Sequence, residues 1–326
     1  MLTREQLLAE ASRLRLQPDM LEKAVRLASL LGHLRDHPYL AGRWALKGGT
    51  ALNLFYLDVP RLSVDIDLNY IGAAEREAML AERPKVEQAI DQTCRRENLT
   101  LQRVPSDHAG GKWRLRYASV LSGGGNLELD LNFLQRVPLW PVQPHDAHLG
   151  TLIEVKAIPV LDLHEVVAGK LVALLARRAA RDLFDAHSQL ANDQLDPKRL
   201  RLAFVLYAAA SRVDFRTRTP DQVDYEPGEL KDSLLPVLRQ EAREALLSQP
   251  EWALRLVAEC RTRLAAVLPF TPAERSFLDR LSDDGEIEPG LLTTDPELAE
   301  RIRLQPGLQW KAWNVREHRR RGETQG

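Results

Sequence analysis

The most informative part of this chain is a pair of neighbouring stretches, RWALKGGTALNLFYL at residues 43–57 and SVDIDLNYI at residues 63–71. The first is a short apolar run that ends in a double glycine and continues with apolar residues at helical spacing. This pattern predicts a strand, a tight turn and a short helix. The second stretch alternates polar and apolar residues, which is the period of a strand with one buried face. We therefore expect a glycine turn to neighbour a strand that has one polar face.

Asp65 and Asp67 share that polar face. Residues two apart on a strand point to the same side, so both carboxylates project together while Ile66 and Leu68 enter the core. Two ionised carboxylates side by side repel each other unless a cation lies between them or one is protonated. Mg²⁺ meets this need, because it takes oxygen ligands and is often held by one or two carboxylates and substrate phosphates. An Asp-x-Asp pair is also common on solvated strand faces, and that alternative stays open.

The double glycine offers a place for phosphate. Gly48 and Gly49 would let the backbone approach a phosphate closely, and the first N–H groups of the next helix carry the positive end of its dipole. A metal-chelated triphosphate could lie across this turn. The hydroxyl of Thr50 either caps the helix or contacts phosphate. The spacing is neither that of a P-loop nor that of a GxGxxG motif.

A third acidic strand residue is expected within LELDLNF at residues 127–133. Glu128, Asp130 and Asn132 share one face of this strand, and the apolar residues share the other. We choose Asp130, because a metal site for phosphoryl or nucleotidyl transfer takes carboxylates from adjacent strands. For Glu128 and Asn132, an exposed strand face is the alternative.

The remaining pattern divides the chain into a mixed half and a helical half. Strands are predicted at residues 99–104, 112–120, 126–134 and 152–160, with a glycine-rich hairpin signal at 122–125. Helices are predicted as a pair within 3–36, then at 73–98 with an interruption at Pro84, and at 162–180, 183–192, 197–212, 229–247, 250–267 and 271–282. The fold class is therefore α/β (α+β), a small mixed sheet with an N-terminal helical pair and a helical C-terminal lobe. We place the sheet domain at residues 1–160 and the helical domain at 161–326.

Composition narrows the class of protein. A hydrophobic fraction of 44% supports a sizeable core, and no run of residues is apolar for long enough to span a membrane. Cys94 and Cys260 form no disulfide or zinc pattern, and the first residues lack the features of a secretory leader, so we expect a cytoplasmic protein. The net charge of −1 means that a polyanion must be met by a local patch.

Three groups of residues could meet such a partner. Trp252, Trp310 and Trp313 could stack on bases, or they pack in the core. The basic run at 198–218 and the tail at 316–321 are candidate RNA contacts, with solvated surface and a frayed terminus as the alternatives. His145 and His148 are predicted to lie in a proline-rich loop without a third ligand, and we expect no metal there.

A further basic group falls in the helical half. Lys170, Arg177 and Arg181 are spaced by seven and four residues, which places them close to one helix face. Such a face could counter phosphate charge. The alternative is a solvated surface on which Lys170 pairs with Asp182 or Asp185.

These motifs together resemble the signature of the AbiEii/AbiGii nucleotidyltransferase toxin family, within the DNA polymerase beta-like nucleotidyltransferase superfamily. The resemblance covers roughly residues 40–190. Its segments are LKGGTAL at 46–52, RLSVDIDL at 61–68, LDL at 129–131, EVVAGKL at 165–171, Arg177 and RDLFD at 181–185.

The resemblance implies a minimal nucleotidyltransferase sheet with a helical lobe. It implies an Mg²⁺- or Mn²⁺-dependent enzyme that transfers NMP from an NTP to RNA, in some members to the tRNA 3′ end. Such a protein would be the toxin of a toxin–antitoxin or phage-defence system and would have an antitoxin as a partner. Two alternatives remain: an inactive nucleotide- or RNA-binding regulator of the same fold, and NMP transfer to a protein hydroxyl.

The resemblance also implies roles for individual residues. The metal ligands would be Asp65, Asp67 and Asp130, and the last of these could also orient or deprotonate the acceptor. The triphosphate would be held by Gly48, Gly49, Thr50 and Lys170, with Arg177, Arg181 and Asp182 beside it. The catalytic group would be completed by Asp185, and either Asp182 or Asp185 answers to the family aspartate.

Overall fold

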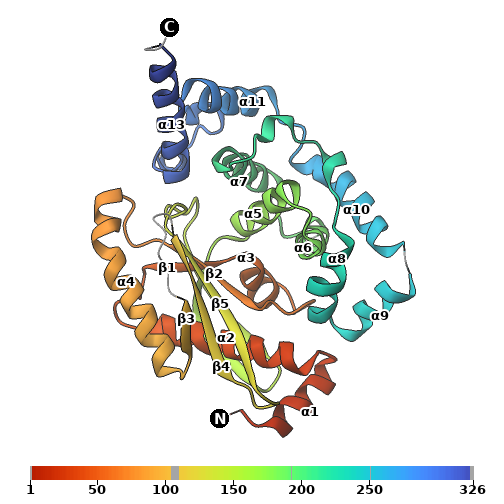
Figure 1. Ribbon diagram of the computed structural model, residues 1–326. Coiled ribbons are helices and arrows are strands. Elements are labelled where there is room, and N and C mark those ends of the chain that lie inside the picture. Colours follow the sequence, from red (N-terminus) through yellow and green to blue (C-terminus); the bar gives the residue numbers. More distant parts are fainter. Residues whose placement is uncertain (1, 104–109, 192, 250, 324–326) are drawn as a thin grey trace. The chain divides into compact units, whose positions relative to one another are not determined.

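The computed structural model describes residues 2–103, 110–191, 193–249 and 251–323, which pack as two compact units (Figure 1). Unit 1 consists of Met1–Arg136, Trp140–Asp162 and Pro227–Ala253. Unit 2 consists of Val137–Leu139, Leu163–Glu226 and Leu254–Gly326. The chain thus returns to unit 1 at residue 227, within the half that the sequence pattern assigned to the helical domain.

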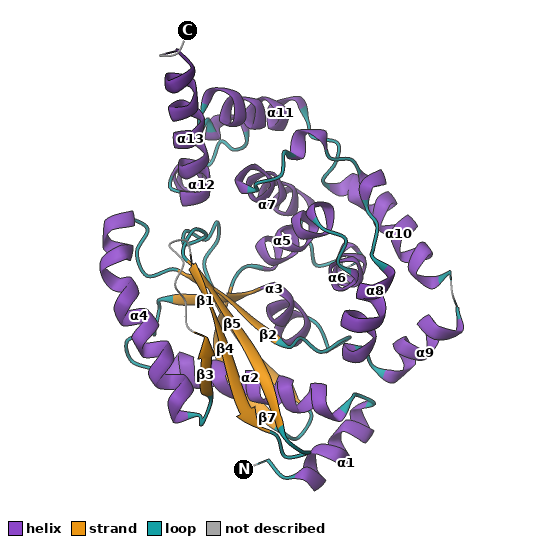
Figure 2. Ribbon diagram, viewed as in Figure 1, coloured by secondary structure: helices purple, strands orange, loops and turns teal. Residues whose placement is uncertain are grey.

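Unit 1 is built on a seven-stranded sheet in the order β3-β4-β5-β2-β1-β7-β6 (Figure 2). The strands are β1 (Trp44–Lys47), β2 (Asp65–Tyr70), β3 (Thr100–Arg103), β4 (Gly110–Ala118), β5 (Gly124–Asn132), β6 (Gln143–Leu149) and β7 (Ile153–Val160). The sheet is mixed, because β2 runs antiparallel to β1 and parallel to β5. The predicted α/β (α+β) class is confirmed. The predicted strand end at Val104 lies outside the described residues.

The alternating sequence pattern explains the two central strands. Ile66 and Leu68 of β2, and Leu129 and Leu131 of β5, are each at most 1% exposed. Helix α2 (Pro18–Asp36) packs against β5 and β7 and supplies leucines to the core. The apolar side of the central strands is thus buried, which leaves the polar side of β2 and β5 for the acidic residues.

The helices of unit 1 are mostly those that the sequence predicts. They are α1 (Arg4–Leu14), α2, α3 (Gly48–Thr50), the π-helical turn η1 (Ala51–Tyr56), α4 (Arg76–Arg96) and α9 (Gln240–Ser248). The N-terminal pair is confirmed, and a capping box formed by Thr3 and Gln6 begins α1. Helix α4 runs through Pro84 without the predicted interruption. Buried residues on both sides of Pro84, among them Met79 and Val86, hold the helix together despite the missing hydrogen bond.

Strand β6 was not predicted, since its proline and its two histidines are typical of a loop. It lies at the edge of the sheet and pairs only with β7. A proline is tolerated there because an edge strand has one side without a ladder partner. Pro144, His145 and His148 are therefore strand residues, and the prediction of a loop was wrong.

The segment that returns to unit 1 is not one helix from 229 to 247, as predicted. It forms α8 (Pro227–Glu229), η4 (Leu230–Leu234), η5 (Leu235–Val237) and then α9. Pro236 lies within η5, where it cannot supply a helical hydrogen bond. The segment is hydrogen-bonded to the backbone of the loop that precedes β2: Leu62 N donates to Val237 O (2.7 Å), and Arg239 Nε donates to Val59 O (2.8 Å).

Unit 2 is helical. Its longer helices are α5 (Leu163–Ala176), α6 (Ala180–Leu190), α7 (Pro197–Ala210), α10 (Trp252–Arg263, which begins at the unit boundary), α11 (Pro272–Asp279), α12 (Pro296–Arg303) and α13 (Pro306–Glu323). Short helical turns connect them, at η2 (Phe215–Thr217), η3 (Pro220–Gln222), η6 (Leu264–Ala266), η7 (Arg280–Asp284) and η8 (Pro289–Leu291). Helix α7 packs on α5, and Phe204 contacts the rings of Phe215 and Phe270. None of the described helices is long and apolar enough to cross a membrane.

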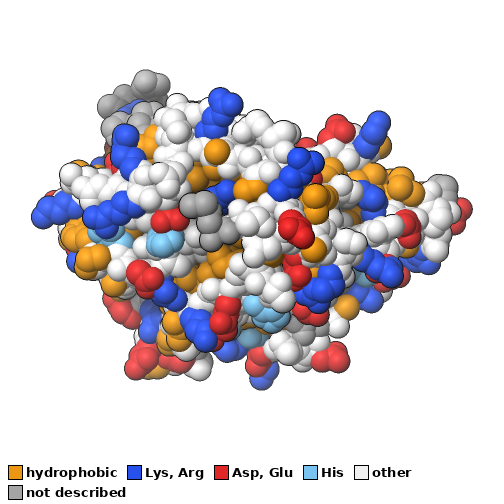
Figure 3. Space-filling model, turned by 90° about the horizontal axis from the view of Figure 1, so that it is seen from below, with side chains coloured by type: hydrophobic (Ala, Val, Ile, Leu, Met, Phe, Trp, Pro, Cys, Tyr) orange, Lys and Arg blue, Asp and Glu red, His pale blue; other side chains and the backbone are white. Residues whose placement is uncertain are grey.

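Charged side chains of both signs are mixed on the face drawn in Figure 3. This mixture agrees with the net charge of −1. Among the described side chains, this face therefore has no extended region of one charge that could attract a polyanion over a long distance. Any such partner needs a local group of cations.

Candidate active site

The glycine turn packs directly on the strand that carries Asp67. Lys47, the last residue of β1, is the cross-strand partner of Asp67 on β2. Gly48 follows with a φ of +72°, and a Cβ atom there would lie 2.3 Å from Oδ2 of Asp67. The left-handed backbone and the nearby carboxylate both require glycine at this position. The predicted neighbourhood of turn and strand is therefore present, and Gly48 is its point of contact.

Thr50 fixes the same turn to β2. Its side chain is buried, and its hydroxyl donates to the carbonyl oxygen of Asp65 (2.5 Å) and lies 2.9 Å from Oγ of Ser63. It makes no side-chain capping hydrogen bond to the following helical turn. The hydroxyl thus holds the end of β2 in place, a role that neither sequence alternative included.

Asp67 and Asp130 lie side by side on parallel strands. The register pairs Asp67 of β2 with Asp130 of β5, and Asp65 with Glu128. Paired residues of adjacent strands share a face, so Asp65, Asp67 and Asp130 project from the same side of the sheet. Burial raises the pKa of Asp130, and the nearby Asp67 carboxylate raises it further, against the opposing effect of Lys47 and Lys112. The pKa of Asp130 is thus raised mainly because the carboxyl is removed from water, and secondly because a like charge lies beside it.

Lys47 is a member of this group that the sequence analysis left without a role. Its Nζ donates to Oε1 of Gln135 (2.8 Å), and the backbone N of Gln135 donates to Oδ1 of Asn132 (3.1 Å). Burial lowers the pKa of Lys47, while Asp67 and Asp130 act to raise it. The signal in the sequence was a lysine at the end of an otherwise apolar strand, directly before the double glycine.

Glu128 and Asn132 have other tasks on the same face of β5. Glu128 pairs with Lys112 (2.9 Å) and Arg114 (3.1 Å) of β4. Asn132 accepts hydrogen bonds from the backbone at the end of the strand, from Leu134 N (2.7 Å) and from Gln135 N. Both residues support the sheet, which leaves Asp130 as the acidic residue of β5 that faces Asp67.

Asp65, Asp67 and Asp130 have the oxygen donors that a divalent cation prefers, but they do not surround a cation on their own. Among the described residues, no three His, Cys, Asp or Glu side chains are gathered as a metal-binding group. Mg²⁺ does not need such a cage, because one or two carboxylates and the phosphates of a substrate commonly complete its shell. Asp65 and Asp67 with Asp130 in register supply hard oxygen donors of this kind.

In unit 2, Lys170 of α5 joins two buried carboxylates of α6. Its Nζ lies 3.1 Å from Oδ1 of Asp182 and 2.9 Å from Oδ2 of Asp185, whose side chains are 2% and 0% exposed. Arg177 Nε donates to Oδ2 of Asp182 (2.7 Å). Burial acts to raise the pKa of Asp182, but Lys170 and Arg177 outweigh it and the pKa is lowered. Both candidates for the family aspartate therefore contact the same lysine.

The expected single basic helix face is wrong. Helix α5 ends at Ala176 and α6 begins at Ala180, so Arg177 lies in the connection and Arg181 belongs to α6. No glycine or proline marks this break. Asp182 lies in the first turn of α6 and is buried. It is neutralised by Lys170 of α5 and by Arg177, which reaches it from the connection between the two helices.

The structure thus has a Gly-Gly turn seated on an Asp-x-Asp strand within a mixed sheet, the arrangement that the resemblance implied. The family model described as "Nucleotidyl transferase AbiEii toxin, Type IV TA system" matches residues 29–304, and the chain belongs to this family of nucleotidyltransferase toxins. The resemblance drawn from the motifs is thereby confirmed.

A solved structure shares the fold. MenT4, a nucleotidyltransferase toxin from Mycobacterium tuberculosis H37Rv, is similar with a TM-score of 0.59 and 19% sequence identity. The match covers 94% of this chain and 99% of that chain. No curated protein sequence matches.

Proposed function

We propose that the protein transfers an NMP from an NTP to an RNA acceptor, with the reaction centred on Asp65, Asp67 and Asp130. The observation that carries this proposal is the position of Asp67, which contacts the Gly48 turn and lies in register with Lys47 and Asp130. A phosphate at the turn would meet backbone N–H groups on one side and the carboxylates on the other. A cation shared by phosphate and carboxylates fits this arrangement.

Asp65 and Asp67, with Asp130, would hold Mg²⁺ or Mn²⁺. When bound, the ion would neutralise triphosphate charge and polarise the α-phosphate. Thr50 keeps the end of β2 at a fixed distance from the turn through its bond to the Asp65 carbonyl. Gly48 and Gly49 would leave room for the triphosphate beside that carboxylate pair.

Asp130 would accept the proton of the attacking hydroxyl. The hydroxyl oxygen forms a bond to the α-phosphorus, the bond from that phosphorus to the bridging oxygen breaks, and pyrophosphate leaves. Asp130 is a carboxylate in register with Asp67 on the neighbouring strand, and this position suits it to take the proton. We assign Lys170, with Arg177 and Arg181, to the charge of the triphosphate, and Asp182 and Asp185 to holding Lys170 in place.

The RNA acceptor, with the tRNA 3′ end as the first candidate, is inferred from the family. So is an antitoxin partner, in keeping with the type IV toxin–antitoxin description. NTP, RNA and reduced cysteines are all found in the cytoplasm, where we place the protein.

The test is incubation of the purified protein with each labelled NTP in turn, Mg²⁺ and total RNA. Label in RNA supports the proposal. Label in protein would instead identify a protein hydroxyl as the acceptor, and nucleotide binding without any transfer would identify a non-catalytic regulator. Asp67→Asn should abolish transfer. Glu154→Gln, an exposed acidic residue of β7, is the matched control and should leave transfer unchanged.

A further inference from the structure

Helix α13 exposes two tryptophans and lines an open cavity within unit 2. Trp310 and Trp313 are 54% and 53% exposed, although aromatic side chains of this size are usually buried or in contact with a partner. The cavity measures about 690 Å³, and its lining includes Trp313, His318, Arg319 and Arg321 of α13. Asp283 of η7 also lines the cavity, so η7 and α13 form its two walls.

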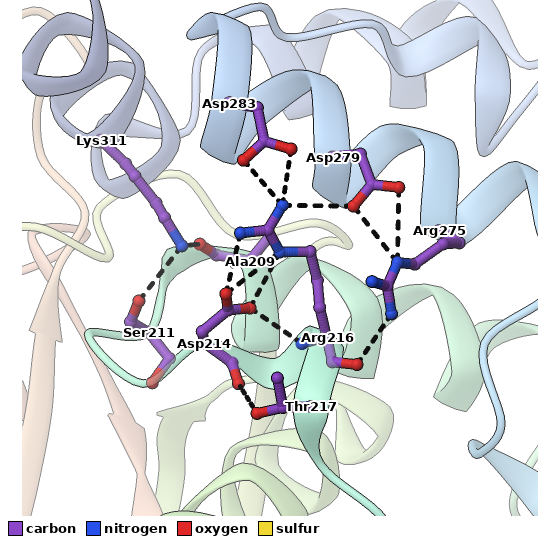
Figure 4. A network of polar contacts seen from close by, with 9 residues as sticks. All are labelled: Ala209, Ser211, Asp214, Arg216, Thr217, Arg275, Asp279, Asp283 and Lys311. Carbon is purple, nitrogen blue, oxygen red and sulfur yellow. Dashed lines mark hydrogen bonds and ion pairs between the residues drawn. The ribbon is translucent and has the colours of Figure 1, made fainter.

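The wall at Asp283 is held in place by Arg216 (Figure 4). Arg216 Nη1 donates to both carboxylate oxygens of Asp283 (2.8 and 2.7 Å) and to Asp279 (3.2 Å), and its Nη2 donates to Asp214 (2.8 Å). Asp283 is thus neutralised and fixed before any ligand arrives. Its charge does not oppose an anion in the cavity as strongly as that of an unpaired carboxylate would.

The other wall, α13, is fastened to η7. Gly285 has a φ of +69°, and a Cβ atom there would lie 2.6 Å from the carbonyl oxygen of Ala312. Arg316 Nη1 donates to the carbonyl oxygen of Gly285, and Arg319 pairs with Asp284 (3.0 Å). These contacts hold both walls of the cavity, so the site is formed without a ligand.

The charge of α13 favours an anionic occupant. The helix carries Lys311, Arg316, Arg319, Arg320 and Arg321, against Glu317 and Glu323. Glu317, the acidic member of the lining on this helix, pairs with Arg320 (3.0 Å). Arg321 is exposed and makes no hydrogen bond or ion pair within the part of the chain that the structure describes.

We propose that this cavity and the adjoining Trp310 form a binding site for single-stranded RNA. Unpaired bases would stack on Trp313 and Trp310, and phosphates would lie against Arg321 and Arg319. Stacking platforms combined with basic side chains are how proteins bind single strands, while the stacked bases of a duplex are not accessible to such a platform. The arginines favour a polyanion over an apolar protein surface. The inference goes beyond the proposed function, because RNA can bind at α13 whether or not the protein transfers a nucleotide.

The test is a titration of the full-length protein with a fluorescein-labelled single-stranded RNA of about ten nucleotides, followed by anisotropy. The Trp313→Ala variant should bind about tenfold more weakly or worse, and Trp313→Tyr should retain most of the affinity. Arg321→Glu should weaken binding and reduce the slope of log K against log salt by about one. The controls Leu247→Ala and Arg96→Glu change exposed residues of unit 1 and should bind like the native chain.

Three results would overturn the inference: no binding of the RNA, unchanged affinity in Trp313→Ala, or equal affinity for a duplex of the same sequence. The first would leave a protein as the occupant, and the last would indicate a contact that depends on charge alone. The Asp67→Asn variant separates this inference from the proposed function. It should bind the RNA normally while lacking transfer, and a native chain that binds RNA without transferring NMP would contradict the proposed function alone.

Discussion

Oδ2 of Asp67 occupies the space that a side chain at Gly48 would need, since a Cβ atom there would lie only 2.3 Å away. The turn and the carboxylate therefore cannot be altered independently. A substitution at Gly48 moves Asp67, or moves the turn away from it, and either change disturbs the proposed site.

Gly48→Ala should lower NMP transfer by about a hundredfold, because a displacement of about 1 Å at a reacting group has an effect of this size. Gly42 provides the control. It has nearly the same backbone conformation, with a φ of +71°, and open space around its Cβ position. Both variants should lose about 1 kcal/mol of stability from the left-handed backbone, but Gly42→Ala should keep its activity. Equal activity in the two variants would contradict the role of the Gly48–Asp67 contact.

Asp130 and Glu128 allow a comparison on one strand face. Asp130→Asn should lower transfer by about a hundredfold or more, which is the usual contribution of a general base. Glu128→Gln removes ion pairs with Lys112 and Arg114, whose side chains are about half exposed, so it should cost less than about 1 kcal/mol and leave transfer within a few-fold of native. Steady-state kinetics and thermal unfolding measure both. If Glu128→Gln is the inactive variant, the choice of Asp130 is wrong.

Lys170→Met should destabilise the fold by about 3–5 kcal/mol, because it leaves Asp182 and Asp185 buried without their shared cation. Urea unfolding of the variant measures this loss. Lys156→Met is the control, since Lys156 and its partner Glu154 are both more than 60% exposed, and its effect should stay within about 0.5 kcal/mol. Native stability in Lys170→Met would mean that the lysine serves the nucleotide and contributes little to folding.

The lowered pKa of Glu10 predicts that the folded protein becomes less stable in acid. Its carboxylate accepts hydrogen bonds from Arg13 and from the backbone and hydroxyl of Thr151, and the first of these contributes most to lowering the pKa of Glu10 to about 2. A carboxyl with a lowered folded-state pKa stabilises the fold above its ordinary value of 4.5, and this contribution is lost as the pH falls through about 2. Glu10→Gln should therefore be less stable than the native chain by about 2 kcal/mol at neutral pH.

The two proteins should approach equal stability near pH 2, measured by urea unfolding across this range. Glu5→Gln, which changes an exposed glutamate of the same helix, should follow the native curve throughout. A constant difference between Glu10→Gln and the native chain at every pH would show that the charge of Glu10 does not matter.

The sequence predicted those parts of the fold that depend on local periodicity. The alternation in β2 and β5 identified both strands and the side on which Asp67 and Asp130 project. It could not predict that the two strands are neighbours in parallel register, because this pairing depends on the packing of segments about sixty residues apart. The role of Lys47 was missed for the same reason, since its neighbours Asp67, Asp130 and Gln135 come from other parts of the chain.

Elements without a local signal were also missed. Strand β6 contains residues typical of a loop and exists because the edge of the sheet tolerates Pro144. The break between α5 and α6 was predicted after residue 180, whereas α5 ends at Ala176, because no glycine or proline marks the point where Arg177 approaches Asp182. The basic tail belongs to a regular helix, α13, because contacts of Arg316 and Arg319 with η7 hold it.

Because Pro227–Ala253 belongs to the sheet unit, the order of synthesis limits when this unit can fold on the ribosome. When translation reaches Asp162, every strand has been made, yet the segment whose Val237 and Arg239 bind the backbone of Leu62 and Val59 does not exist. The carboxylate-bearing half of a toxin thus cannot finish folding until some ninety further residues have been synthesised. A nascent chain that stalls before this point carries the aspartates without their completed scaffold, which delays the appearance of a harmful activity until synthesis is well advanced.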